Sequence, residues 1–134
     1  MFPVTTKRVS DPPSASDGVR ILVMRFWPRG VARSAVNQWF RELGTNPALI
    51  QRWKQGALRW AEFRRAYQRE LQDPAARQAI TEIRKLLRKS PVTLLCSCPE
   101  EARCHRSILR QVILQQAAAR VPGAPRKRPL PPTK

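Results

Sequence analysis

The chain has 134 residues, with 26 Lys and Arg, 9 Asp and Glu, and a formal charge of +17, and this length suits a single domain. It has no apolar run near the roughly 20 residues that a membrane-spanning helix needs, and its first residues lack the apolar region of a secretory signal. We therefore expect a cytoplasmic protein without a membrane segment. Its charge favours a partner that is nucleic acid or an anionic small molecule.

The first thirty residues alternate strand-like and turn-like segments. Residues 4–9 alternate β-branched side chains and predict a short strand, and the proline-rich residues 10–18 predict a turn. Residues 19–26 contain the apolar run Ile21, Leu22 and Val23, which is typical of a strand buried on both faces. The WPRG segment at 27–30 ends this strand, because proline cannot donate to a central ladder.

Helical periodicity dominates the middle of the chain. Apolar residues at helical spacing predict a helix from Ser34 to Gly44, and Asn46-Pro47 and Asp73-Pro74 each pair a cap with a proline at a helix start. Residues 60–71 and 74–87 carry further apolar stripes, which we interpret as core. Trp53 and Trp60 lie among arginines and could stack nucleic-acid bases, although their helical spacing favours packing.

A second buried strand is predicted at VTLLC, residues 92–96, and a final helix from about Arg103. The order of elements predicts an α/β fold with a small, mostly parallel sheet of about three strands flanked by helices. Residues 1–119 would form this domain. Residues 120–134, with five prolines, five basic residues and no acidic ones, would form a disordered basic tail. The oligomeric state does not follow from the sequence.

Ligands of such sheets bind beyond the carboxyl ends of the strands. Residues 25–30 follow one buried strand and residues 97–106 follow the other, so we expect the two segments to meet there. The predicted anion-binding residues are Arg25, Trp27, Arg29, Arg103 and Arg106.

Three stretches of the chain resemble a known family. KRVSDPPSASDGVRILVMRFWPRGV, RWAEFRRAYQREL and PVTLLCSCPEEARCHRSIL are similar to segments of the YeaO-like family, which carries domain of unknown function 488. The resemblance covers roughly residues 4–115 and implies the fold and a site, but no reaction. Members usually have an aspartate where this chain has Met24, so any role of that carboxylate is absent here.

The stretch from Cys96 to Arg106 holds all three cysteines and the one histidine, and it has three interpretations. The first is thiol catalysis by Cys104, His105 and Arg106, where a helix start favours a thiolate. Cys98 is a weaker candidate, because two glutamates follow it closely, although its spacing to Arg103 is similar to that of rhodanese-type sulfurtransferases.

The second interpretation is a zinc site formed by Cys96, Cys98, Cys104 and His105. Adjacent Cys104 and His105 on a helix would point about 100° apart, which disfavours it. The third is a structural corner in which Cys96 fills the sheet while His105 and Arg106 bind an anion. No cofactor other than zinc is indicated. We therefore predict an anion-binding pocket at the carboxyl ends of the strands, with thiol chemistry as an option. A basic nucleic-acid-binding accessory protein is the alternative.

Overall fold

The computed structural model describes residues 1–98 and 103–119, and the side chains up to residue 115. It contains a four-stranded sheet made of β1 (Val4–Arg8), β2 (Val19–Leu22), β3 (Gln38–Trp39) and β4 (Val92–Cys96). The strand order is β1-β4-β2-β3, and every neighbouring pair is parallel. The predicted α/β fold with a small parallel sheet is confirmed, and β3 is a short strand that the sequence did not predict.

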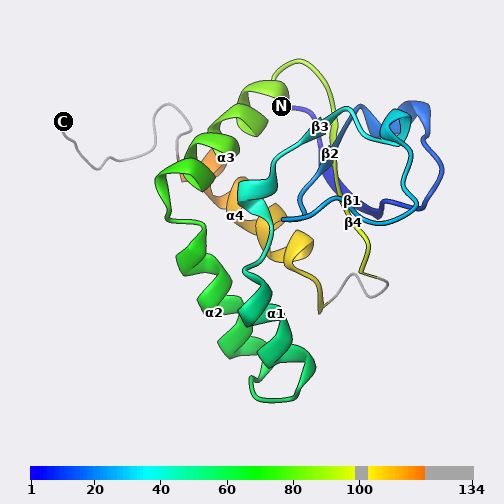
Figure 1. Cartoon of the computed structure of the whole chain (residues 1–134). Helices are drawn as coiled ribbons and strands as arrows, with labels where there is room; N and C mark the ends of the chain where they lie inside the picture. The colour runs from blue at the N-terminus through cyan, green and yellow to red at the C-terminus, as the bar shows by residue number, and fades with distance from the viewer. Residues whose placement is uncertain (99–102, 120–134) are drawn as a thin grey trace.

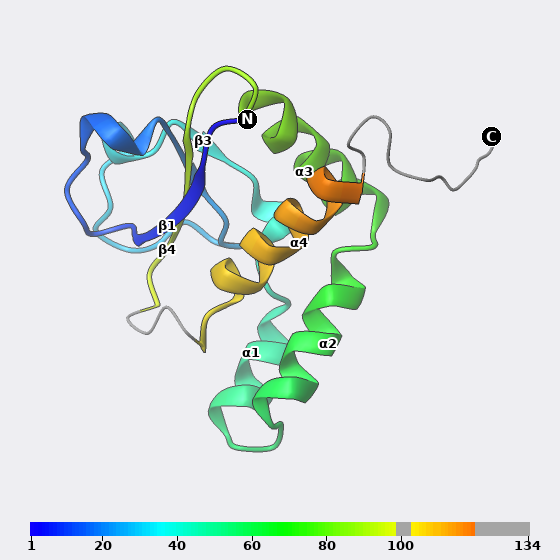
Figure 2. The same ribbon diagram turned by 180° about the vertical axis from the view of Figure 1, so that it is seen from behind.

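Four helices lie on one side of the sheet (Figure 1 and Figure 2). They are α1 (Pro47–Lys54), α2 (Trp60–Glu70), α3 (Pro74–Leu86) and α4 (His105–Ala119). One of them, α4, packs directly against β1 and β4. The predicted starts of α1 and α3 are confirmed, because Asn46 and Asp73 accept hydrogen bonds from the backbone N–H groups two residues on, at 2.8 and 3.2 Å.

Helices α1 and α2 form a hairpin that extends away from the sheet (Figure 1). The ring centroid of Trp53 lies 5.4 Å from that of Trp60 and 5.7 Å from that of Phe63. These aromatic side chains therefore pack the two helices together, as their helical spacing indicated.

The predicted helix from Ser34 to Gly44 is wrong. The segment forms two short 3-10 turns, Arg33–Ala35 and Arg41–Leu43, on either side of β3. The backbone N–H groups of Asn37 and Phe40 donate to the carbonyls of Arg20 and Leu22 at 2.9 and 3.0 Å, so this segment bonds to β2 instead of to itself. Trp39 and Phe40 pack against the two different apolar clusters, which is the alternation of a strand.

Two apolar clusters lie on opposite faces of the sheet. The larger one joins alternate strand residues to the helices and includes Ile21, Leu94 and Leu109. The smaller one is built on Val9, Leu22 and Leu95 and is covered by the segment after β2, with Met24, Trp27, Val31, Val36 and Trp39 packed against it.

A buried ionic network lies on the same face as the smaller cluster. Asp17 accepts hydrogen bonds from Arg20 Nη1 at 2.6 Å and from Lys7 Nζ at 3.1 Å, and Arg20 also donates to the carbonyls of Ala35 and Asp11. Gly18 follows with φ 65°, and a Cβ there would lie 2.0 Å from the Pro91 carbonyl oxygen. Only glycine therefore fits at this position.

Two further predictions concern the tail and a membrane-spanning helix. The predicted disordered tail, residues 120–134, lies outside the described residues. Within the described part of the chain, none of the helices has the length and apolar character required to cross a membrane.

Candidate functional site

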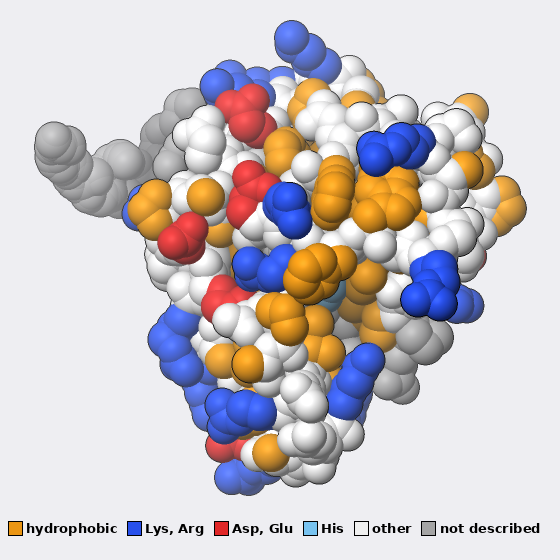
Figure 3. All heavy atoms as spheres, viewed as in Figure 1, with side chains coloured by type: hydrophobic (Ala, Val, Ile, Leu, Met, Phe, Trp, Pro, Cys, Tyr) orange, Lys and Arg blue, Asp and Glu red, His pale blue; other side chains and the backbone are white. Residues whose placement is uncertain are grey.

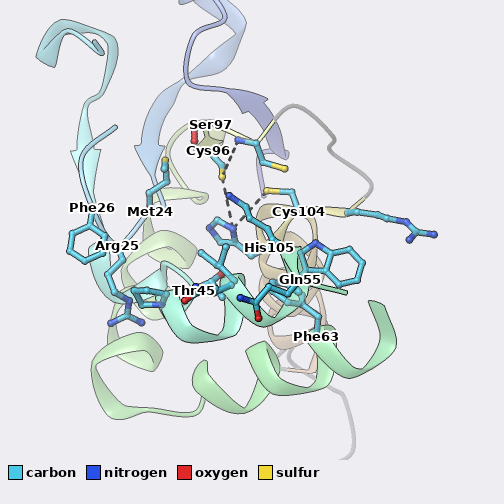
Figure 4. A pocket seen from close by; sticks show the side chains of 17 residues that line it. Met24, Arg25, Phe26, Thr45, Gln55, Phe63, Cys96, Ser97, Cys104 and His105 are labelled. Atoms are coloured by element: carbon cyan, nitrogen blue, oxygen red, sulfur yellow. Dashed lines mark hydrogen bonds between the residues drawn. The ribbon is translucent and has the colours of Figure 1, made fainter. Parts of the chain in front are cut away.

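The segments that follow β2 and β4 meet at one edge of the sheet. Leu22 lies opposite Leu95 in the parallel register, so the carboxyl ends of the two strands are neighbours. Met24, Arg25 and Phe26 follow β2, Cys96 ends β4, and all four line one pocket (Figure 4). Of the predicted segment 25–30, Arg25 and Phe26 line this pocket.

Cys96, Cys104 and His105 form a compact group at the inner end of this pocket, here called the Cys-Cys-His cluster. The Nδ1 atom of His105 lies 3.9 Å from Cys96 Sγ and 3.7 Å from Cys104 Sγ. The three ligand atoms all lie within 4.8 Å of one another, and the residues are only 4%, 3% and 7% exposed. Figure 4 shows the three side chains pointing toward one another.

The hydrogen bond of Nε2, the other ring nitrogen of His105, fixes the tautomer of the imidazole. Nε2 lies 2.6 Å from the carbonyl oxygen of Val23, and a carbonyl can only accept, so Nε2 carries the proton. In the neutral ring Nδ1 therefore presents its lone pair to the two sulfur atoms. The imidazole is also held edge-on against the ring of Tyr67, with centroids 5.4 Å apart.

Tyr67 is itself held firmly in place. Its hydroxyl donates to the Leu43 carbonyl at 2.6 Å, and burial raises its pKa well above the usual value, so the hydroxyl stays neutral. Tyr67 therefore orients His105 without supplying a charge.

Cys104 and His105 converge because they are not both part of a regular helix. Helix α4 begins at His105, and Cys104 belongs to the turn before it. The objection that adjacent helical side chains diverge therefore does not apply. Of the four residues predicted as a zinc site, three come together. Cys98 is half-buried in the pocket wall, and its N–H donates to Cys96 Sγ at 3.5 Å.

The two cysteines of the cluster have opposite pKa shifts. A hydrogen bond from the Cys104 thiol lowers the pKa of Cys96 to about 4, against the effect of burial. The same contact with Cys96, together with burial, raises the pKa of Cys104. Of the two thiols, Cys96 is therefore the one whose ionisation the contact favours. The sequence left open whether Cys96 is a zinc ligand or a packing residue of the sheet.

The pocket has a volume of about 810 Å³ and lies between α1, the end of β4 and the start of α4. Its walls are largely apolar, with Phe26, Trp53 and Phe63 among them. Figure 3 shows a hollow on this side of the molecule with hydrophobic side chains around it and Lys and Arg side chains nearby. Three cationic side chains, Arg25, Lys54 and Arg103, line the pocket, and no carboxylate does among the described lining residues.

Two buried polar atoms of the lining lack a hydrogen-bond partner within the described residues. They are the hydroxyl of Thr45, a residue that is 2% exposed, and Nε of Arg25. Arg25 is anchored by a 2.9 Å hydrogen bond from Nη2 to the Gly44 carbonyl. A Cβ on Gly44 would lie 2.1 Å from the backbone nitrogen of Arg25. Glycine therefore permits the close approach that places Thr45 beside Arg25.

The predicted anion-binding residues fall into two groups. Arg25 and Arg103 line the pocket, whereas Trp27 and Arg29 are not among its lining residues. Trp27 packs with the smaller apolar cluster, edge-to-face with Trp39 at 5.4 Å, and Arg29 is exposed. Arg106 is 2% exposed and donates to the Cys98 carbonyl at 2.8 Å, so it holds the cysteine loop from behind.

Sequence reasoning missed Thr45 and Lys54. Both come from the segment at the start and end of α1 that folds over the carboxyl ends of the strands. No motif marks either residue, because their place in the pocket depends on how α1 packs.

Comparison with known proteins places the chain beside an uncharacterised group. Residues 4–117 match the family described as the active DUF488-N3 subclade, DUF488-N3a. The chain is 35% identical to the uncharacterised protein YeaO of Escherichia coli over 109 residues, which cover 79% of this chain and 92% of YeaO. It is 33% identical to the uncharacterised protein Rv3073c of Mycobacterium tuberculosis over 112 residues, which cover 82% and 92% of the two chains. No solved structure matches the chain.

Proposed function

Since the chain belongs to the YeaO-like DUF488 family, in which the matching relatives above carry no assigned activity, we propose its function from its own site. The pocket binds a small anionic molecule and brings it to the Cys-Cys-His cluster. The observation that carries this proposal is the pair of unpartnered buried groups, Thr45 Oγ1 and Arg25 Nε, in a pocket lined by cations.

Unpartnered buried donors cost free energy, because each has lost its water without gaining a protein partner. Where such groups line a cavity, a ligand can supply the missing acceptor. Arg25, Lys54 and Arg103 add positive charge without a compensating carboxylate among the described lining residues, so the missing acceptor is an anion. The volume of about 810 Å³ is that of a small-molecule site, and the aromatic wall suits an anion with a flat apolar part.

The cluster gives this pocket a chemical centre. Cys96 and Cys104 supply sulfur, and His105 Nδ1 is positioned to accept a proton from either thiol. In this role Cys96 or Cys104 is the nucleophile, Cys98 is a second thiol on the wall, and Arg106 positions the loop. Thiol catalysis on the bound anion is the second candidate function, and it is favoured by the lowered pKa of Cys96.

Calorimetric titration with adenosine monophosphate, and with adenosine as the neutral match, tests the anion proposal. We expect the monophosphate to bind at least about tenfold more tightly, and Arg25→Gln and Lys54→Gln each to weaken it by about tenfold. Arg29→Gln removes the same charge outside the pocket and is the control. Equal binding of both ligands, or equal loss in all three variants, would contradict an anion site here.

Nucleic-acid binding remains the alternative, and the α1–α2 hairpin favours it. Its exposed arginines are Arg52, Arg59, Arg64, Arg65 and Arg69. Two variants test whether these residues and the tail contact phosphates. One replaces Arg64, Arg65 and Arg69 by glutamine, and the other deletes residues 120–134. If the contacts exist, each variant should make the slope of log K against log salt shallower, by up to about 0.9 per lost contact. Slopes that stay unchanged for mixed-sequence duplex DNA and for single-stranded RNA would rule this alternative out.

A further inference from the structure

We infer that the Cys-Cys-His cluster is a binding site for one zinc-type metal ion. The ion would be held by the thiolates of Cys96 and Cys104 and by Nδ1 of His105, with its fourth ligand position open to the pocket. This inference deepens the proposed function, because the bound anion would then complete the metal's coordination.

The distances between the ligand atoms already fit such an ion. Zn–S bonds of about 2.3 Å and Zn–N bonds of about 2.05 Å at tetrahedral angles place sulfur and nitrogen about 3.6 Å apart. The observed separations from Nδ1 are 3.7 Å to Cys104 Sγ and 3.9 Å to Cys96 Sγ. Shifts of a few tenths of an ångström would bring both nitrogen–sulfur distances to this value, and the two sulfur atoms already lie within 4.8 Å of each other.

The groups behind the ligands are those that a metal site requires. A metal-binding imidazole usually donates its other N–H to a carbonyl or carboxylate, which fixes the tautomer and the ring orientation. Here Nε2 donates to Val23 O at 2.6 Å. The Cys98 N–H donates to Cys96 Sγ at 3.5 Å, and such a bond stabilises a sulfur that carries negative charge.

Burial adds a second argument. All three residues are less than a tenth exposed, yet Nδ1 has only weak sulfur contacts as partners for a strong acceptor. A metal ion would satisfy Nδ1 and would neutralise two thiolates in a place where burial alone disfavours charge. Two soft sulfur ligands with one imidazole select Zn²⁺ or Co²⁺ over Mg²⁺ or Ca²⁺.

Three protein ligands beside an open pocket are the arrangement of a reactive site, because structural zinc sites use four. Cys98 is the residue that could close this site. It lies outside the three-residue group, so we expect the fourth position to stay exchangeable.

Metal analysis of the full chain, purified under reducing conditions with zinc supplied, is the first test. We expect about one zinc ion per chain in the parent protein and in Cys98→Ser, and a loss of affinity of more than about 100-fold in Cys96→Ser and Cys104→Ser. Replacement by Co²⁺ should give thiolate-to-cobalt absorption in the parent and Cys98→Ser only. Circular dichroism checks that the variants fold.

The inference is overturned if the folded parent protein retains no zinc and shows no cobalt band. It is also overturned if Cys98→Ser loses the metal as fully as Cys96→Ser, since the site would then be closed and structural. If the purified protein retains no zinc, Cys96 and Cys104 can be labelled with dithionitrobenzoate with and without added zinc. Equal labelling rates in the two conditions would leave thiol chemistry as the role of the cluster.

Titration of the cobalt protein with adenosine monophosphate separates the two proposals. A change in the visible cobalt bands supports an anion at the open position. If the monophosphate binds and the bands do not change, the link between anion and metal is refuted while the pocket proposal stands. If the metal binds and the monophosphate does not, the anion-pocket proposal fails while the three-ligand site stands.

Discussion

The Lys7–Asp17–Arg20 network and the Cys-Cys-His cluster are two buried polar groups on opposite faces of one sheet. In the first, Asp17 Oδ2 accepts from Arg20, Lys7 and the Ser14 N–H at 2.6, 3.1 and 3.0 Å, and the remaining donors of Arg20 reach backbone carbonyls. The second lies beside a pocket in which Thr45 and Arg25 hold unpartnered polar atoms. We interpret the completed set of partners as structural, and the unpartnered atoms that line a cavity as a place for a ligand.

Several residues of the opening motif, on which the family resemblance partly rests, belong to the structural network and not to the pocket. Lys7, Asp17 and Arg20 belong to the opening motif that carries the resemblance, and all three are in the structural network. Trp27 of the WPRG segment packs with Trp39 and donates its N–H to the Val31 carbonyl at 2.9 Å. These residues of the opening motif therefore have structural roles, whereas the chemistry that we propose lies in the cysteine-rich segment, which the resemblance also covers.

The largest effect is expected from breaking the structural network. Asp17→Asn removes the charge that pairs with buried Arg20, and we expect unfolding in urea to show a loss of about 3 kcal/mol. Glu82→Gln breaks the exposed pair with Lys85 at 3.4 Å and should cost less than about 0.5 kcal/mol. Similar losses in the two variants would show that the network is not structural.

The pH dependence of stability should report the same network. Despite burial, hydrogen bonds from Arg20, Lys7 and Ser14 lower the pKa of Asp17 below its usual value of 3.8. Its contribution is therefore complete above the unfolded-state pKa of about 3.9, and it is lost as the pH falls through the lower pKa of the folded state.

We expect the parent protein to lose more stability than Asp17→Asn between about pH 5 and pH 2. Urea midpoints measured across this range test the prediction, and parallel curves would contradict it.

The elements that the sequence predicted are those whose signals lie close together along the chain. The buried strand at 92–96 and the starts of α1 and α3 were predicted because apolar runs and caps lie within a few residues. β3 was missed because its partner is β2, far away along the chain: Ile21 pairs with Gln38, and the flanking Asn37 and Phe40 N–H groups donate to Arg20 and Leu22. Periodicity alone cannot show such pairing.

The site shows the same division. The cysteine-rich segment was found from its composition, but the convergence of Cys104 with His105 depends on a turn before α4. Thr45 and Lys54 reach the pocket only through the packing of α1. The chemical groups were therefore predictable, whereas their geometry required the tertiary structure.

Loss of an unpartnered polar atom from the pocket should stabilise the folded protein, whereas loss of a partnered polar group from the network should destabilise it. Thr45→Val keeps the shape of the side chain but removes the hydroxyl that lacks a partner in the described structure. We expect the ligand-free protein to gain about 1 kcal/mol of stability and to bind adenosine monophosphate about tenfold more weakly. Thr93→Val is the matched control, because its hydroxyl donates to the Asp17 carbonyl at 2.8 Å, and it should be destabilised. A loss of stability in Thr45→Val would show that the hydroxyl already has a structural role.

The smallest effect is expected at Met24, the position at which the family resemblance led us to expect an aspartate. Met24 lines the pocket, so Met24→Asp would add the negative charge that the described lining lacks. Repulsion should weaken binding of adenosine monophosphate by about fivefold at low salt and by less at high salt, where the charge is screened. Met24→Asn changes the side chain to a similar polar shape without charge, and it should retain most of the affinity. If both variants bind equally well, the charge of the pocket does not select its ligand, and the contrast with the network rests on the unpartnered Thr45 and Arg25 atoms alone.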